Sequence, residues 1–190
     1  MNPDALLKEA TEGRLGRAGQ QQIADALASR AEGADPYVLL LALGRAMATQ
    51  HRAIVESFLH EHRDPMLVRL ALQVLCKFWG ETSSHLERVR ELLVPQPWDV
   101  DGDARQMAIS VAGEYLRGAR DRQLLESLLT IVTSDSEDEV TRSDAYLSVA
   151  RAMGRSWDEL PRISRLPPLQ ELVDPNLIEA ARARCLGSGA

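Results

Sequence analysis

Residues 65–79 read PMLVRLALQVLCKFW, and this stretch decides the class of fold. Apolar side chains recur in it at the three- and four-residue spacing of an α-helix, and they form two stripes. One stripe holds Leu67, Ala71, Val74 and Phe78, and the other holds Val68, Leu72 and Leu75. A helix with two apolar stripes must be covered on more than one side, so the pattern predicts a helix packed between other helices.

The same alternation continues along the chain. Residues 84–93 have one apolar face surrounded by charged residues, which predicts a half-buried helix. Residues 104–116 and 121–132 form a second pair of helical patterns, and residues 138–153 begin a third pair. The repeating unit is therefore a pair of helices, and the chain is predicted to be all-α.

The internal spacing supports a repeat. Arg69, Arg105 and Arg142 stand early in the three first helices, 36 and 37 residues apart, which is a period typical of helical solenoids. Asp64 before Pro65, and Asp103, are expected to cap two of these helices, because a carboxylate accepts hydrogen bonds from the unpaired first amides. Asp35 before Pro36 opens an earlier copy.

These residues resemble the first helix of the HEAT and armadillo-like repeat family, which commonly begins with an Asp followed by a Val-Arg pair and small or apolar residues. The resemblance rests on Asp64, Pro65, Val68, Arg69, Ala71, Leu72 and Leu75, and it extends over residues 35–153. The earlier copy departs from the pattern because it lacks the Arg, and Ala104 stands where Val is expected. The resemblance implies a right-handed α-α superhelix of about four to five helix pairs.

We expect one domain over residues 1–190. Residues 1–34 are predicted to form capping helices separated by Gly13, Gly16 and Gly19, and residues 35–154 the repeat core. Residues 155–190 are predicted to form a strap broken by proline and a final capping helix that opens at Asp174 and Pro175.

Composition limits the classes of function. The chain of 190 residues is 45% hydrophobic, carries a net charge of −6, and holds 16 acidic against 11 basic side chains in residues 96–190. A net negative charge disfavours nucleic acid and slightly favours a basic protein partner. The absence of a long apolar run or a secretory signal predicts a cytoplasmic protein with no membrane span, in which Cys76 and Cys185 stay reduced.

Two motifs resemble metal-binding sites, and both lack ligands that such a site requires. The alternating carboxylates of residues 99–103 resemble a calcium loop, but Gly102 comes too early and Ser110 stands where the bidentate Glu belongs. His60, Glu61 and His62 form one His-Glu pair, whereas the HEAT-like deoxyhypusine hydroxylases use several. No phosphate loop, nucleophile elbow or zinc-protease spacing occurs, so we predict neither an enzyme nor a metal or cofactor.

Partner-binding residues are expected on three kinds of surface. The second helices of a superhelix would line a concave face, and they offer Arg52, Glu56, Arg88, Glu91, Arg122 and Glu126. The loops offer Trp98 and the acidic Asp135, Glu137 and Asp138. Trp157 lies in sequence among Arg151, Arg155, Arg162 and Arg165, a combination that suits a binding hot spot or stacking on a nucleobase. Each feature also has a structural reading: helix-end compensation for the acidic run, and packing for the two tryptophans.

The leading functional hypothesis is a non-enzymatic protein-protein interaction module, a scaffold or an immunity protein that inhibits a basic toxin. One alternative is a HEAT-like DNA-binding protein or alkylpurine DNA glycosylase, although the charge and the sparse aromatics disfavour it. A second alternative is a bilin-lyase-like protein that handles a tetrapyrrole.

Overall fold

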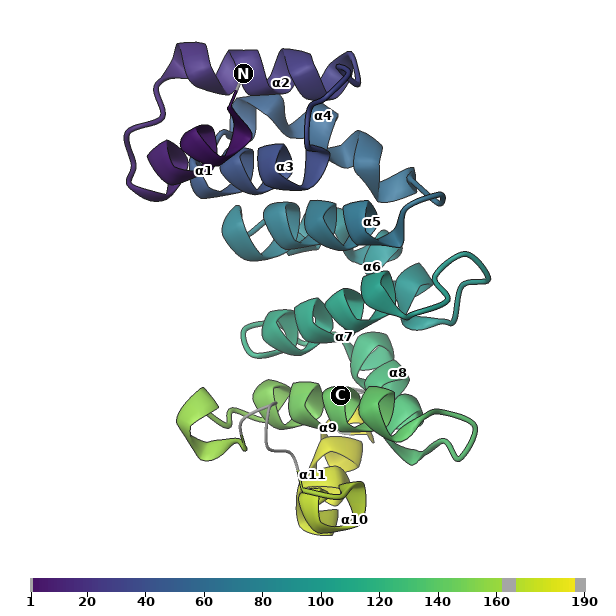
Figure 1. Ribbon diagram of the computed structural model, residues 1–190. Coiled ribbons are helices and arrows are strands. Elements are labelled where there is room, and N and C mark those ends of the chain that lie inside the picture. The colour runs from purple at the N-terminus through teal and green to yellow at the C-terminus, as the bar shows by residue number, and fades with distance from the viewer. Residues whose placement is uncertain (1, 162–166, 187–190) are drawn as a thin grey trace. The chain divides into compact units, whose positions relative to one another are not determined.

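The computed structural model describes residues 2–161 and 167–186. Helices hold 71% of the residues, and the described ranges contain no strand, which confirms the all-α prediction. Figure 1 shows the helices in chain order. Within the same ranges, no helix has the length and apolar character that a bilayer crossing requires.

The chain divides into two compact units. The first unit comprises Met1–Leu86 and Pro95–Met107, and the second comprises Glu87–Val94 and Ala108–Ala190. The boundary between them runs through α6 (Leu86–Leu93) and α7 (Asp103–Leu116). The prediction of one domain with a cap, a repeat core and a strap stays a prediction.

The first unit is built from short helices whose starts follow from the sequence. They are α1 (Pro3–Thr11), α2 (Arg17–Ala28), α3 (Pro36–Arg45), α4 (Arg52–Ser57) and α5 (Pro65–Leu72). Asp35 caps α3 as expected, because its carboxylate accepts from the amides of Tyr37 and Val38. Gly19, in contrast, lies inside α2 and does not separate two helices.

The predicted helix over residues 65–79 is present, but its second half is wound differently. After α5, residues Gln73–Phe78 form a π-helical segment. This segment packs against α3 at Gly44, where an added Cβ would lie 2.5 Å from the Phe78 ring and 2.8 Å from Val74. The close approach requires a glycine in α3, because Val74 and Phe78 of the π-helical segment leave no room for a Cβ at this position.

Two predicted helix caps have other partners. The carboxylate of Asp64 accepts from the Tyr37 hydroxyl and makes no capping bond to α5. The first amides of α7 bond to Asp99, which accepts from Ala104 at 3.2 Å and from Arg105 at 2.9 Å. The prediction that Asp103 caps α7 was therefore wrong; Asp103 is the first helical residue and binds Arg69 at 3.0 Å.

The second unit contains the longer helices. Besides its parts of α6 and α7, it holds α8 (Arg122–Thr133), α9 (Glu139–Ala152), α10 (Leu169–Leu172) and α11 (Pro175–Leu186). The helices predicted over residues 121–132 and 138–153, and the one opening at Pro175, are confirmed to within a residue or two. The predicted strap contains the short α10, and residues 162–166 of it lie outside the described ranges.

Arg184 of α11 joins two helix ends within this unit. Its guanidinium donates to the carbonyl of Ala152 at 2.6 Å, and to the carbonyls of Leu116 and Ala119 at 3.1 Å each. Leu116 and Ala152 are the last residues of α7 and α9, where a helix leaves its final acceptors unpaired, and Ala119 lies in the turn after α7. One side chain therefore caps both helices and fixes α11 against them.

Candidate functional site

The charged residues expected on a concave face are engaged with other side chains. In the first unit, α4 carries Arg52 and Glu56 four residues apart, and both face the segment that follows the π-helix. Arg52 forms an ion pair with Glu81, and Glu56 Oε1 lies 3.7 Å from Nε2 of the buried His85. These contacts fasten α4 to residues 81–85.

The corresponding residues of the second unit are paired within their own helices. Arg88 binds Glu91 at 2.6 Å in α6, and Arg122 binds Glu126 at 2.7 Å in α8. Pairs at these spacings stabilise a helix slightly and neutralise each other. All six predicted residues are thus placed on α4, α6 and α8, and each contacts an opposite charge or the buried histidine.

The acidic run before α9 serves the start of that helix. Asp138 accepts from the amide of Thr141 at 2.9 Å and from its hydroxyl at 2.6 Å, and these bonds lower the pKa of the Asp138 carboxyl. Asp135 lies 3.5 Å from Arg142. Glu137 directly precedes the cap residue Asp138. The structural reading explains Asp138, while the side chain of Asp135 is almost fully exposed although it pairs with Arg142.

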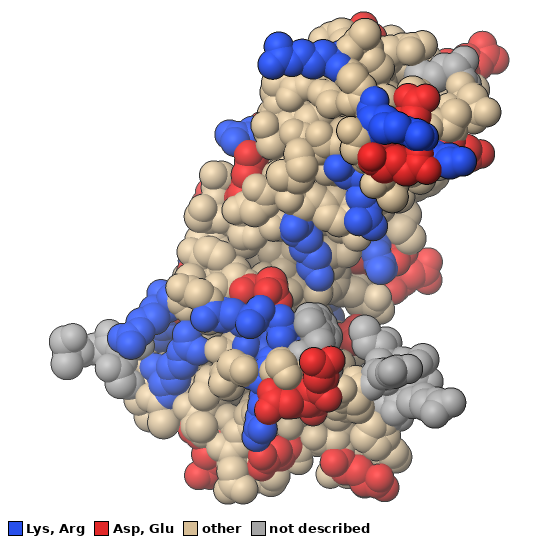
Figure 2. Space-filling model, turned by 90° about the vertical axis from the view of Figure 1, so that its left-hand side faces the viewer, with Lys and Arg blue, Asp and Glu red and all other residues tan. Residues whose placement is uncertain are grey.

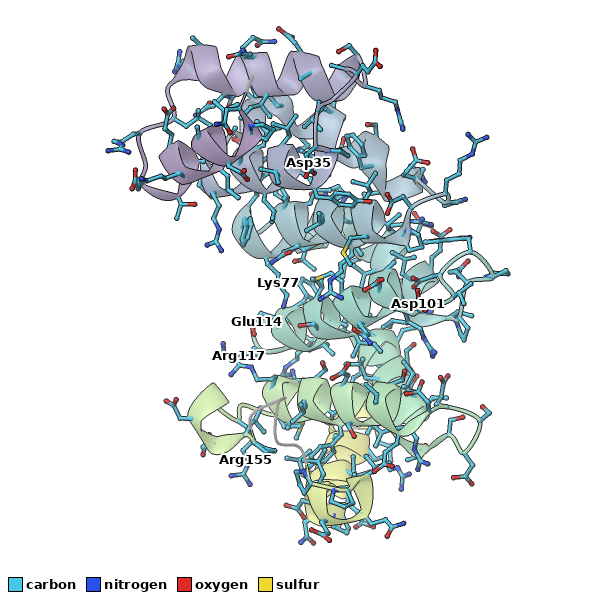
Figure 3. All side chains as sticks on the ribbon, in the orientation of Figure 1. Asp35, Lys77, Asp101, Glu114, Arg117 and Arg155 are labelled. Atoms are coloured by element: carbon cyan, nitrogen blue, oxygen red, sulfur yellow. The ribbon has the colours of Figure 1, made fainter. Side chains whose placement is uncertain are left out.

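The arginine-rich region after α9 is only partly described. Arg155 lies 3.7 Å from Glu159, and Arg151 donates to Glu114 of α7 at 2.8 Å. The side chain of Trp157, and residues Arg162 and Arg165, lie outside the described part of the structure. Figure 3 shows Arg117 near Glu114, and Arg155 on the same side of the second unit but farther from Glu114. Figure 2 shows acidic side chains among the basic ones on the face it presents.

Trp98 has the most distinctive surroundings of the predicted residues. Its ring stacks on the His62 ring, with centroids 4.7 Å apart and planes inclined by 10°. Val100, two residues later in the same loop, is 87% exposed. We refer to His62, Trp98 and Val100 as the Trp98 edge of the first unit.

The Trp98 edge is held from both sides. On one side, the buried carboxylate of Asp99 fixes the loop by bonding to the start of α7. On the other, the turn that carries His62 is fixed at Glu61, which binds Arg30 at 2.5 Å, and at Asp64, which accepts from Tyr37. The Tyr37 bond raises the pKa of that phenol to about 12, chiefly because the hydroxyl donates to a carboxylate. The aromatic pair is therefore presented by a rigid turn and a rigid loop.

Neither candidate metal motif forms a ligand cluster. Among the described residues, no group of three or more His, Cys, Asp or Glu side chains is placed to hold a metal ion. Within the predicted motifs, Asp99 accepts backbone amides, Asp103 binds Arg69, and His62 stacks on Trp98. These groups have structural roles that account for their positions.

Sequence reasoning missed Arg30, His62 and His85. Arg30 and His85 contact residues 31 and 29 positions away, at Glu61 and Glu56, so no local pattern marks them. His62 was considered as a metal ligand, and the presence of Trp98 in a long loop was the one signal for an aromatic contact. No protein-family profile, curated protein or solved structure matches the chain.

Proposed function

We propose that this chain is a non-enzymatic binding module, an α-solenoid of HEAT-like helix pairs that binds a partner protein through the loops between its helices. The observation that carries the proposal is the Trp98 edge, in which an indole held flat against His62 stands beside a valine that is 87% exposed. Tryptophan is enriched among the residues that dominate binding energy. A ring that is already ordered also loses less entropy when a partner covers it.

The loop edge suits this role better than the concave face. The six charged residues expected on that face already contact groups of their own chain, such as Glu81 for Arg52 and Glu91 for Arg88. Exposed ion pairs contribute little binding energy and serve mainly to select a complementary surface. A half-buried tryptophan and an exposed valine offer apolar area whose removal from water favours association.

The chemistry of the partner follows from charge. The chain carries a net charge of −6, and the Trp98 edge lies next to the exposed Asp101 and the half-buried Asp64. A partner with a basic surface around an apolar contact would complement it. A cytoplasmic immunity protein that neutralises a basic toxin is the narrower form of this proposal.

The proposal is tested by affinity capture from a native cell extract, using four forms of the tagged chain. These are the wild type, Trp98→Ala, Val100→Ser and the control Val140→Ser, which changes another exposed valine at the start of α9 in the second unit. We expect the wild type and the control to retain the same protein in stoichiometric amount. With the purified partner, Trp98→Ala should weaken binding at least about 30-fold, as hot-spot residues do.

Other outcomes contradict the proposal. Equal retention of the partner by all four forms would remove the Trp98 edge from the interface. Loss of the partner only in an Arg88→Glu and Arg122→Glu double variant would place the site on α6 and α8 instead. Retention of nucleic acid or a chromophore in place of a protein would favour the DNA-binding or tetrapyrrole alternative.

A further inference from the structure

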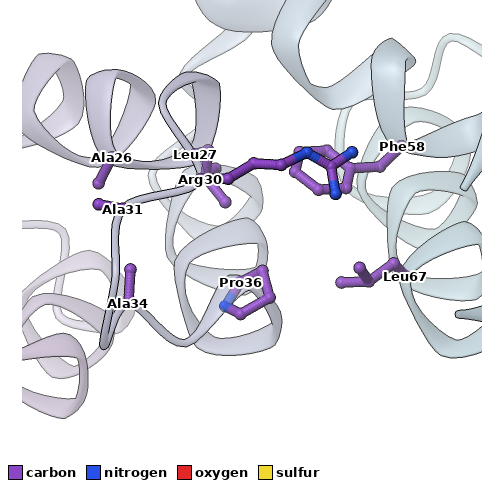
Figure 4. Close-up of a pocket in the computed structure, with 8 residues that line it drawn as sticks. All are labelled: Ala26, Leu27, Arg30, Ala31, Ala34, Pro36, Phe58 and Leu67. Carbon is purple, nitrogen blue, oxygen red and sulfur yellow. The ribbon is translucent and has the colours of Figure 1, made fainter.

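A cleft of about 190 Å³ opens in the first unit, between the end of α2, the start of α3, the turn after α4, and α5. Its wall is apolar and includes Leu27, Ala31, Ala34, Phe58 and Leu67. Figure 4 shows the side chain of Arg30 extending from the end of α2 towards the ring of Phe58, with Pro36 and Leu67 on one side of it. The cleft is therefore an apolar recess with one cation at its mouth.

Arg30 has bonding capacity left at this mouth. Its guanidinium carbon lies 5.7 Å from the centroid of the Phe58 ring, and Nη2 donates to Glu61 at 2.5 Å. This bond is the main cause of the lowered pKa of the Glu61 carboxyl. A guanidinium has five N–H donors, and within the described residues Glu61 is the only acceptor to which the Arg30 guanidinium donates a hydrogen bond. The remaining donors suit a second carboxylate, which arginine binds in a planar, bidentate way.

The backbone of Arg30 adds an independent observation. Arg30 has a φ of 48°, in the left-handed region that disfavours residues with a Cβ. The turn itself is an ordinary helix end, because the amide of Arg30 bonds to the Leu27 carbonyl and that of Ala31 to the Ala26 carbonyl. Glycine would serve this turn with less strain, so the backbone gains nothing from an arginine here. What the arginine supplies is a cation over the cleft, and strained residues of this kind cluster at ligand sites.

We infer that this cleft receives an apolar side chain of the partner protein that has a carboxylate beside it, and that Arg30 binds the carboxylate. The inference rests on the proposed protein-binding function and names a second contact of the same first unit. A cavity of roughly 150 Å³ accepts a benzene-sized group, so a volume of 190 Å³ suits a leucine or phenylalanine side chain. Arg30 and Arg63 both act on Glu61, so two guanidinium groups lie near this one carboxylate. The carboxylate is local to the inserted residue, so it is compatible with a partner that is basic elsewhere.

A small-molecule probe tests the chemistry of the cleft. The probe is 4-methylpentanoate, which joins a leucine-like side chain to a carboxylate, and its uncharged counterpart is 4-methylpentanamide. Binding is followed by nuclear magnetic resonance of chain labelled with ¹³C at alanine methyl groups. We expect saturable shifts of the Ala31 and Ala34 signals, with the amide binding about three- to fivefold more weakly, as the loss of an exposed ion pair predicts.

Two variants test separately how the Arg30 cation and the apolar recess contribute to binding. Arg30→Gly keeps the turn and removes the cation, so the acid and the amide should bind equally weakly. Ala34→Leu fills the recess, so neither compound should shift the signals. Met47→Gly is the matched control, because Met47 is the other non-glycine residue with a left-handed backbone in the described chain, with φ 50°, and it does not line the cleft. Thermal unfolding of all three variants confirms that each is folded.

The same variants connect the cleft to the partner. Ala34→Leu should weaken binding of the captured partner about tenfold, while Met47→Gly leaves it unchanged. No saturable shift in the wild type, or equal binding of acid and amide to it, overturns the inference. If Trp98→Ala weakens partner binding but Ala34→Leu does not, the proposed function stands and the inference fails. If neither variant weakens partner binding, the proposed function itself fails.

Discussion

A Cβ added at Gly113 of α7 would lie 2.6 Å from the Cβ of Ser148 in α9 and 2.7 Å from its backbone. Both residues belong to the second unit, and their contact leaves no room for a methyl group. The backbones of α7 and α9 therefore meet at this point. The contact depends on a glycine that the apolar pattern of residues 104–116 would not require.

The Gly113→Ala variant should lower the free energy of unfolding by about 1–3 kcal/mol, because the obstructing atoms include backbone and cannot rotate away. The higher helix propensity of alanine offsets part of this cost. Gly118→Ala is the control, since nothing lies within 4 Å of its added methyl group, and it should change stability by less than about 0.5 kcal/mol. Urea denaturation measures both, and equal stability of the two variants would contradict the predicted contact.

The cap of α9 should make stability depend on pH. Hydrogen bonds from Thr141 lower the pKa of Asp138 below its ordinary 3.8, so its ionised form stabilises the folded state. That stabilisation is complete above the unfolded pKa and is lost as the pH falls through the lower, folded pKa. Asp138→Asn keeps an acceptor at the cap but cannot ionise.

The free-energy difference between wild type and Asp138→Asn should therefore shrink as the pH falls from about 7 to about 3, because the Asp138 carboxyl of the unfolded chain takes up its proton before that of the folded chain. Asp138→Ala, which removes the acceptor, should cost about 1 kcal/mol at about pH 7. Urea denaturation at the two pH values gives these differences. A wild type to Asp138→Asn difference that is the same at both would show that the carboxylate charge does not contribute.

The sequence predicted where most helices lie because their apolar periodicity is local. Residues 121–132 and 138–153 carry that pattern together with the cap residues Asp121 and Asp138, and both helices are found there. The π-helical form of Gln73–Phe78 could not be predicted, since it accompanies the packing of Phe78 on Gly44, 34 positions earlier in the chain. The cap of α7 was assigned to the wrong carboxylate. Asp99 and Asp103 both lie at the start of this helix, and the fold of the turn between them decides which one reaches the first amides.

The candidate site, like the fold, could be predicted only in part from the sequence. A tryptophan in a long loop was a visible signal, and the structure places Trp98 against the ring of His62. Its stacking on His62 depends on two turns 36 residues apart coming together, which no local pattern specifies. The pairing of Arg52 with Glu81 also depends on segments that are distant in sequence coming together. Arg52, which the sequence offered as a partner-binding residue, therefore makes a contact within its own chain.

Cys76 should be unreactive in the folded chain. Burial raises the pKa of its thiol to about 11, so almost none is thiolate at about pH 8, and reagents have little access to it. Alkylation by iodoacetamide, followed by mass spectrometry, should be at least about 100-fold slower in the native chain than in urea. Similar rates in the two conditions would mean that residues 73–78 open frequently.

Arg30 and Met47, the two non-glycine residues with a left-handed backbone in the described part of the first unit, should respond differently to replacement by glycine. Met47 has an exposed side chain and a φ of 50°, so Met47→Gly relieves strain and should raise the free energy of unfolding by about 0.5–1 kcal/mol. Arg30→Gly relieves the same strain but also removes the exposed ion pair with Glu61 and the contact with Phe58, each worth about 0.5–1 kcal/mol. Its free energy of unfolding should therefore lie about 0–1.5 kcal/mol below that of the wild type, in contrast to the gain in Met47→Gly. Urea denaturation distinguishes the cases: a destabilised Met47→Gly would show that these positions are not strained, and the arginine would then need no functional explanation.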